Sequence, residues 1–188
     1  MPVLISLLRG VNVGGHRKLK MDELRAVYES LGCGNVKTYV QSGNVIFTIR
    51  DRDVATIRQR IEKAIERKFG FHADVIVRTA SEMRDVIARN PFATREDIES
   101  NKLLVSFLAA EPSEAIRQRV EAIAAPHPEE VRIGGRELYI YFTNGMARPK
   151  LPAAQVDRTL GMASTGRNWN TVMKLLEIAE ALAAESSR

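Results

Sequence analysis

Apolar and polar residues follow two different periods along the chain, and together these periods predict a mixed α+β protein. Residues 3–8 form a nearly unbroken apolar run, which is typical of a central strand buried on both faces. Helical spacing alternates with period-two spacing after it. The predicted order is strand 3–8, helix 22–31, hairpin strands 36–40 and 45–49, helix 53–69 and strand 73–79. This βαββαβ order is that of a split-βαβ or ferredoxin-like unit.

The second half of the chain repeats the pattern of the first half. Leu103–Leu108 matches Val3–Leu8, including a serine in the fourth place, and begins a second strand-helix-hairpin order. The predicted elements are strand 103–108, helix 112–124, a hairpin over 129–142, helix 153–160 and a last helix after Arg167. No final strand is evident. Between the halves, Ser81 is the predicted cap of a helix that ends at Asn90-Pro91.

We therefore predict an α+β fold of two ferredoxin-like (βαββαβ-type) repeats, the second degenerate and extended by a C-terminal helix. The predicted first unit covers residues 1–79, and the second, which carries that helix, covers residues 80–188. Ile46 and Ile76 lie on a sheet face that needs cover, so we expect the second unit to pack on the first.

Composition and charge narrow the class of protein. The 188 residues are 45% hydrophobic and 27% charged, as in ordinary globular domains, with no apolar run near the start long enough for a membrane span and no leader evident. A single cysteine, Cys33, excludes an internal disulfide and favours a cytoplasmic location. The net charge of +5 and pI near 9.6 favour anionic partners.

The loop after the first strand is the first candidate site. Residues 9–18 (RGVNVGGHRK) carry three glycines, Gly10, Gly14 and Gly15, together with Asn12 and four cationic or titratable side chains. Glycines let backbone N–H groups approach an anion, so phosphate binding is one interpretation, and a glycine-shaped turn with solvated basic residues is the other. The spacing half-matches a P-loop, but His16-Arg17 stand where Lys-Ser/Thr is needed, which disfavours nucleotide hydrolysis.

Two further segments are rich in amides and hydroxyls. The first is the hairpin around Tyr39, Gln41, Ser42 and Asn44, and the second precedes the last helix. The second segment contains Arg167, Asn168, Trp169 and Asn170. Either segment suits a polar ligand, and either equally suits a turn or helix cap that holds itself together.

Other chemistries are disfavoured. Cys33 follows a helix C-terminus, where the dipole opposes a thiolate, and His16, His72 and His127 show no metal-ligand spacing, so no metal is predicted. RNA-recognition domains share the βαββαβ order but stack bases on aromatic strand residues. Here the first strand has no aromatic residue and Phe47 faces the helices, so that mechanism is disfavoured while electrostatic binding stays open.

Four motifs in order give the chain a family resemblance. They are LLRGVNVGG from Leu7, TYVQSGNV from Thr38, NPF from Asn90 and TGRNWNTV from Thr165. This set resembles the DUF1697 family of uncharacterised, mostly bacterial proteins, whose typical patterns are RGINVGG, TYIQSGNV, NPF and TTRNWNT. The chain departs from them at Val11, Val40 and Gly166, the last of which removes a hydroxyl. The resemblance implies an α+β fold with ferredoxin-like units and supplies no catalytic residue or cofactor.

Three functional hypotheses follow. The first is a binding module or small enzyme whose polar cleft, lined by Arg9, Asn12, Gln41, Asn44, Arg167 and Asn168, takes an anionic small molecule or nucleotide. The second is a nucleic-acid-binding protein, and the third is a structural module whose motifs fix turns and caps. We expect Arg9 and Asn44 to meet at one end of the sheet, joined by Arg167 if the last helix docks there. Neither arginine has an acidic residue within four positions, so both are predicted anion contacts.

Overall fold

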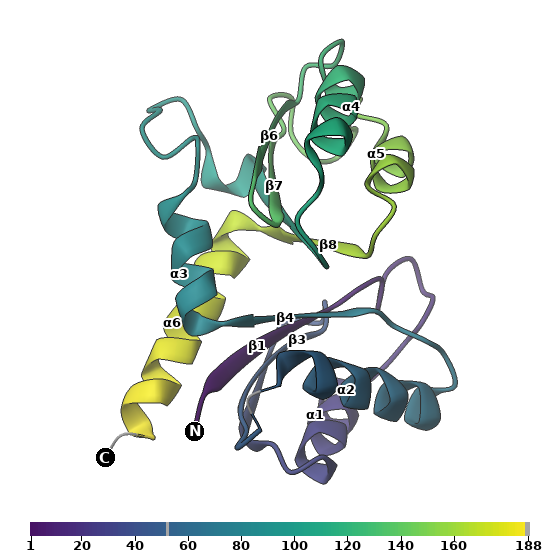
Figure 1. The fold of residues 1–188 in the computed structure, drawn as a ribbon, viewed down its shortest axis with the longest axis vertical. Helices are drawn as coiled ribbons and strands as arrows, with labels where there is room; N and C mark the ends of the chain where they lie inside the picture. Colours follow the sequence, from purple (N-terminus) through teal and green to yellow (C-terminus); the bar gives the residue numbers. More distant parts are fainter. Residues whose placement is uncertain (52, 187–188) are drawn as a thin grey trace. The chain divides into compact units, whose positions relative to one another are not determined.

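A computed structural model describes residues 1–51 and 53–186 (Figure 1). In chain order the elements are β1 (Val3–Leu8), α1 (Met21–Ser30), β2 (Gly34–Tyr39), β3 (Asn44–Thr48), α2 (Val54–Phe69), β4 (Val75–Thr79), α3 (Ala80–Ala88), η1 (Ser100–Lys102), β5 (Leu103–Leu108), α4 (Glu114–Ala124), β6 (Glu130–Gly134), β7 (Glu137–Tyr141), α5 (Ala153–Leu160), β8 (Ser164–Asn168) and α6 (Trp169–Glu185). They form a mixed α+β fold with two four-stranded antiparallel sheets.

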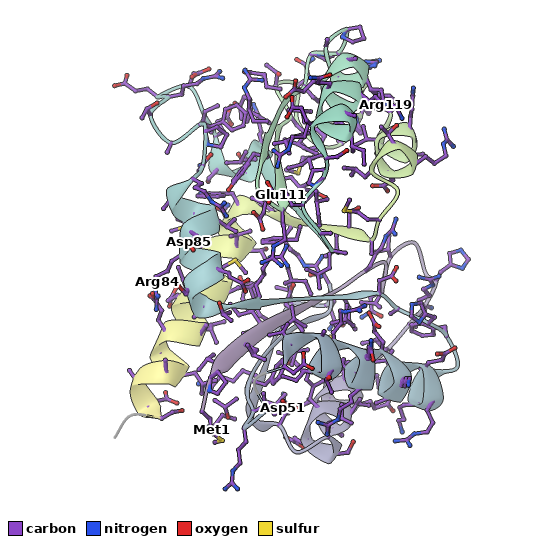
Figure 2. The ribbon with its side chains drawn as sticks, in the orientation of Figure 1. Met1, Asp51, Arg84, Asp85, Glu111 and Arg119 are labelled. Atoms are coloured by element: carbon purple, nitrogen blue, oxygen red, sulfur yellow. The ribbon has the colours of Figure 1, made fainter. Side chains whose placement is uncertain are left out.

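The chain divides into two units. Unit 1 comprises Met1–Arg84 and the chain from Lys174 onward, and unit 2 comprises Asp85–Met173. The segment from Lys174 is the larger part of α6, and an ion pair between Arg84 Nε and Glu180 Oε1 at 2.7 Å links it to α3; Arg84 is labelled in Figure 2. The prediction that the second half packs on the first stays a prediction.

Unit 1 has the strand order β2-β3-β1-β4, with α1 and α2 on one face of the sheet (Figure 1). The core between them is built from the alternate strand residues that point at the helices, among them Leu4, Val45 and Phe47. Phe47 meets Tyr28 of α1 edge to face, with 5.1 Å between ring centroids. Phe47 therefore faces the helices, as its place in the alternation predicted.

Unit 2 has the equivalent strand order, β6-β7-β5-β8. Its core joins α4 and α5 to one face of that sheet through Val120, Val156 and Leu160 from the helices and Leu138 and Ile140 from β7. The central strand β5 pairs with β7 on one side and β8 on the other, as β1 pairs with β3 and β4.

The second half has a final strand, so the prediction that it lacks one is wrong. Residues 164–168, predicted to be a polar segment before the last helix, form β8, in which Arg167 lies opposite Val105. The segment has no apolar residue to mark it as a strand. It fits beside β5 partly because Gly166 has no side chain: a Cβ there would lie 3.0 Å from Leu104 Cδ2.

Two helix starts also differ from prediction. Ser81 is not the cap of α3, because Thr79 and Glu82 form a capping box. Thr79 Oγ1 accepts from the Glu82 N–H, and Glu82 Oε2 accepts from the Thr79 N–H. In the second unit Ser113 caps α4, so the predicted first-turn residue Pro112 lies outside the helix.

No helix in the described residues is long and apolar enough to cross a membrane.

Replacing Asp53 with alanine is expected to lower the melting temperature in a pH-dependent way. Asp53 caps α2 by accepting from the N–H groups of Ala55 and Thr56. The hydrogen bond from the Thr56 hydroxyl, followed by those from the two backbone N–H groups, lowers the pKa of its carboxyl. A lowered folded-state pKa stabilises the protein above the unfolded value of about 3.9, and that contribution disappears as pH falls through the folded pKa. Melting curves of the two proteins should therefore differ at pH 7 and converge only as the pH falls below the ordinary range of an aspartate and through the lowered pKa of Asp53. A difference that persists unchanged at low pH would contradict a charged cap.

Candidate functional site

The candidate site lies where three segments of unit 1 meet at one end of its sheet. At this end β1 finishes while its antiparallel neighbours β3 and β4 begin. The Leu8 N–H donates to the Gly43 carbonyl and the Arg9 N–H to the Asp74 carbonyl, both at 2.9 Å. The sheet topology thus brings Arg9 and Asn44 to the same end, as expected from the strand order.

The loop of residues 9–20, called the N-terminal loop below, has an unusual backbone. Positive φ angles occur at Gly10, Asn12, Gly14, Gly15 and Arg17. An isolated antiparallel bridge joins Val13 to His16, and the Asn12 N–H donates to the Arg17 carbonyl at 3.2 Å. Three glycines fit such a path at no steric cost and Asn12 tolerates it, whereas Arg17 adopts it against preference. The loop is a folded structure of its own.

The Asn12 side chain holds this loop together. Its Nδ2 donates to the carbonyls of Leu19 and Gln41 at 3.0 and 2.8 Å, and its Oδ1 accepts from the Leu19 N–H at 2.9 Å. These three bonds join both ends of the loop to the β2–β3 hairpin. The amide therefore acts as a clamp, which is the structural alternative for this motif.

The hairpin turn of residues 40–43 is fixed just as closely. The buried Asn44 donates from Nδ2 to the Tyr39 carbonyl and to Ser42 Oγ, both at 2.9 Å. Val40 has φ +49° although it is β-branched and 50% exposed. Backbone strain of this kind persists only when the surrounding bonds determine it, and it concentrates at functional sites.

Gly43 presses the turn against the N-terminal loop. It has φ +75°, and a Cβ at this position would lie 2.7 Å from Val11 Cγ2 and 2.8 Å from Leu8 Cβ. The two motifs TYVQSGNV and RGVNVGG thus form a single packed structure. Tyr39 and Gln41 supply only backbone oxygens to it: the Gln41 side chain is exposed, and that of Tyr39 is half-buried.

The outer surface of the N-terminal loop is cationic. His16, Arg17, Lys18 and Lys20 are all exposed, and within the described residues no carboxylate forms an ion pair with any of them. A groove of about 550 Å³ lies beside Lys18 and Lys20. It is lined by Asn12, Gly15, Lys18, Leu19, Lys20, Glu23 and Gln41. Lys20 and Glu23 lie outside the set of residues that sequence reasoning selected.

Arg9 takes part in a second cluster at this end of the sheet. Its Nη1 lies 3.7 Å from Asp74 Oδ2, and His72 Nε2 lies 3.2 Å from Asp74 Oδ1. The expectation that no carboxylate takes up the Arg9 guanidinium was based on the local sequence, and the partner comes from 65 positions further along the chain. Only the antiparallel pairing of β1 with β4 reveals this ion pair.

The remaining predicted residues belong to unit 2. Arg167 is only 6% exposed, and its Nη1 donates to Thr165 Oγ1 at 2.7 Å and to the Gly166 carbonyl at 2.8 Å. Burial lowers the pKa of Arg167 to about 10, which leaves the guanidinium charged at neutral pH. Asn168 Oδ1 accepts from the Asn170 N–H at 3.0 Å at the start of α6, and its Nδ2 donates to the Asn101 carbonyl. The asparagine therefore caps the helix.

Metal and thiol chemistry find no support in the described part of the chain. No group of three or more His, Cys, Asp or Glu side chains there is placed to hold a metal ion. Cys33 is buried, and burial raises the pKa of its thiol to about 11, which makes the thiol a poor nucleophile at neutral pH.

Changing Gly43 to alanine is expected to lower the free energy of unfolding by about 2 to 4 kcal/mol, because the new Cβ adds overpacking to left-handed strain. Gly70 provides a matched control, since its φ is +76° and a Cβ there meets nothing within 4 Å. The Gly70→Ala change should cost only the strain, about 1 kcal/mol. Denaturant titrations measure both, and equal losses would show that contact with the N-terminal loop is unimportant.

Replacing Arg167 with alanine is expected to lower the free energy of unfolding by about 2 kcal/mol or more, because it removes buried packing and hydrogen bonds. Arg132 of β6 is the control: its side chain is 57% exposed, and its removal should change stability by less than about 0.5 kcal/mol. The same titrations apply, and an unchanged stability for Arg167→Ala would favour a ligand contact over a structural role.

Comparisons with known proteins bear on the family and the fold. A family model described as "Protein of unknown function (DUF1697)" matches residues 1–139. The solved structure of a conserved bacterial protein from Streptococcus pneumoniae is similar, with a TM-score of 0.69 and 21% identity over 95% of this chain and 98% of that one. That likeness concerns the fold. No curated protein matches the chain. The family match spans both motifs of the N-terminal site, and the chain belongs to the DUF1697 family.

Proposed function

We propose that the protein binds an anionic small molecule, of which a phosphorylated metabolite or nucleotide fits best, on the N-terminal loop of unit 1. The observation that carries this proposal is the set of exposed cations Arg17, Lys18 and Lys20, which lack carboxylate partners among the described residues, on a loop whose backbone is fixed. A rigid loop loses little conformational entropy when a ligand binds, so its charges act as a preorganised site.

The groove beside the loop supports a ligand with more than a phosphate. Lys18 and Lys20 attract the anionic group, while the Glu23 carboxylate and the Gln41 amide accept hydrogen bonds from hydroxyl or amino groups. A free phosphate would contact only Lys18 and Lys20. A nucleotide or an amino-bearing phosphorylated metabolite would also contact Glu23 and Gln41, and the volume of about 550 Å³ is within the range of small-molecule sites.

The amides of the site have a supporting role in this proposal. Asn12 and Asn44 are occupied in holding the loop and the turn, so they place the cations and contact the ligand little. Of the residues selected from sequence, Gln41 and the backbone at Gly15 are those whose position beside the groove suits direct contact.

We also propose that the two units are ferredoxin-like repeats and that the protein is located in the cytoplasm. The βαββαβ element order and the strand order with β1 or β5 inside each sheet support two ferredoxin-like repeats. The single buried cysteine supports a reducing compartment, the cytoplasm.

The test compares two triple variants that each exchange one arginine and two lysines for glutamine. The loop variant is Arg17→Gln, Lys18→Gln, Lys20→Gln, and the matched control is Lys63→Gln, Arg67→Gln, Lys68→Gln on the exposed face of α2. Pyrophosphate and ATP are the probes, measured by calorimetry and by melting temperature. The loop variant is expected to weaken binding at least tenfold, since hydrogen bonds to charged groups contribute about 1.5 to 3 kcal/mol each.

The control variant loses the same charge and should bind like the unchanged protein. Equal weakening in both would mean that net charge alone attracts the probes. A single-stranded oligonucleotide of ten residues separates the nucleic-acid alternative. If it binds much more tightly than ATP, with a slope of log K against log salt steeper than about −3, roughly four phosphates are engaged and the small-molecule proposal is wrong.

A further inference from the structure

A second cavity, in unit 2, has the opposite electrostatic character. It lies between the end of α4 and the start of β6 and has a volume of about 490 Å³. Its polar lining is Glu121, His127, Glu129, Glu130 and Arg132. Three of these five are carboxylates, in a protein whose net charge is +5. We call this space the acidic cavity.

Glu129 is the buried member of this lining, and one of its oxygens has no partner. The residue is 6% exposed, and its Oε1 accepts from the Lys150 N–H at 2.7 Å. Its Oε2 is buried and accepts no hydrogen bond from any described residue. A buried carboxylate oxygen without a donor is costly, and native proteins place a water, an ion or a ligand at such atoms.

The end of α4 adds negative potential at the same place. Ala124 and Ala125, the last residue and the cap of the helix, line the cavity. The helix has no basic residue in its last turn, so its own side chains do not offset the partial negative charge of the dipole. This feature is independent of Glu129 and favours the same kind of occupant, a cation.

The nature of the donors indicates which cation. Glu130 is engaged by Arg95 at 2.8 Å and by Arg132 at 3.8 Å. That leaves too few carboxylates for a metal, in keeping with the lack of any three-residue metal group in the described chain. A protonated primary amine needs three acceptors and tolerates a mixture of carboxylate and carbonyl oxygens.

We propose that the acidic cavity binds a small organic molecule through a protonated primary amine, with Glu129 Oε2 as the charged acceptor. Glu129 lines the cavity, and its Oε2 is the carboxylate oxygen that has no donor among the described residues, while Oε1 is held by the backbone N–H of Lys150. Glu121 and the end of α4 supply further negative charge. This site is separate from the proposed anion site and does not depend on it.

The probe is 1,4-diaminobutane, added to the full chain at constant chloride and ionic strength. At a concentration 100 times Kd, the melting temperature should rise by about 5 °C or more. Tetramethylammonium has the same charge but no N–H donor, and it should give no comparable rise. An equal rise with tetramethylammonium or potassium would overturn the proposal, as would a larger rise with magnesium. No rise with the diamine means that water alone occupies the site, which also overturns it.

The variant Glu129→Gln tests whether the Glu129 carboxylate binds the amine or only stabilises the fold. The amide retains the acceptor for the Lys150 N–H and removes the buried charge, so the variant should melt at the same or a higher temperature without amine and lose the response to amine. Glu96→Gln is the matched control, since Glu96 is an exposed carboxylate of the same unit. A Glu129→Gln protein that melts lower but still responds to the diamine would overturn the proposal.

Arg132→Gln tests the same charge balance without touching the buried group. The change removes the positive charge from the cavity lining and with it the repulsion of the diamine. Calorimetry should show that the diamine binds about threefold to tenfold more tightly, which corresponds to about 1 kcal/mol. Unchanged or weaker binding would contradict an electrostatic role for the cavity.

Discussion

Antiparallel pairing of one central strand on both of its sides is the constraint on which each unit depends. Because β1 runs against β3 and β4, its last residues meet the first residues of both neighbours, and three segments far apart in sequence must converge there. The same bonds recur in unit 2. The backbone N–H of Leu108 donates to the carbonyl of Arg136, and that of Ala109 donates to the carbonyl of Ala163. The equivalent backbone bonds in unit 1 run from Leu8 to Gly43 and from Arg9 to Asp74. A candidate site at this end of the sheet is thus a consequence of topology.

The two units differ in the length of the connection that follows the central strand. In unit 1 twelve residues separate β1 from α1, whereas five separate β5 from α4. The longer connection carries the cations, the glycines and the Asn12 clamp. Other positions are equivalent: Arg78 lies opposite Ile5 and Arg167 opposite Val105, and both arginines are buried. The two sheets thus share these positions, and the N-terminal loop is a feature of unit 1 that the shorter connection of unit 2 does not have.

Much of this fold could be predicted from the sequence because apolar alternation is set by burial within each element. Phe47 and the run 3–8 are examples. β8 could not be found in this way, since pairing with β5 and the missing side chain of Gly166, and not apolar residues, make it a strand. The two N-terminal motifs could be singled out from the sequence, and the strand pairing brings them to one end of the unit 1 sheet. The roles of the individual residues in these motifs could not be predicted. An asparagine that holds a loop and an asparagine that contacts a ligand are the same residue in a sequence, and only their hydrogen bonds distinguish them.

The distinction between clamp and contact follows from the chemistry of the side chains. An amide has both donors and acceptors, so Asn12 satisfies two backbone groups of Leu19 in its own loop and the carbonyl of Gln41 in the hairpin turn, which neither a lysine nor an arginine is able to do. Cations offer donors only, and within the described residues Arg17, Lys18 and Lys20 form no ion pair with a carboxylate. Glu129 presents the opposite case, a buried acceptor that lacks a donor among the described residues. Both proposals therefore rest on charged groups that lack a protein partner among the described residues, exposed cations in unit 1 and the buried Glu129 Oε2 in unit 2, and not on the amide-rich motifs.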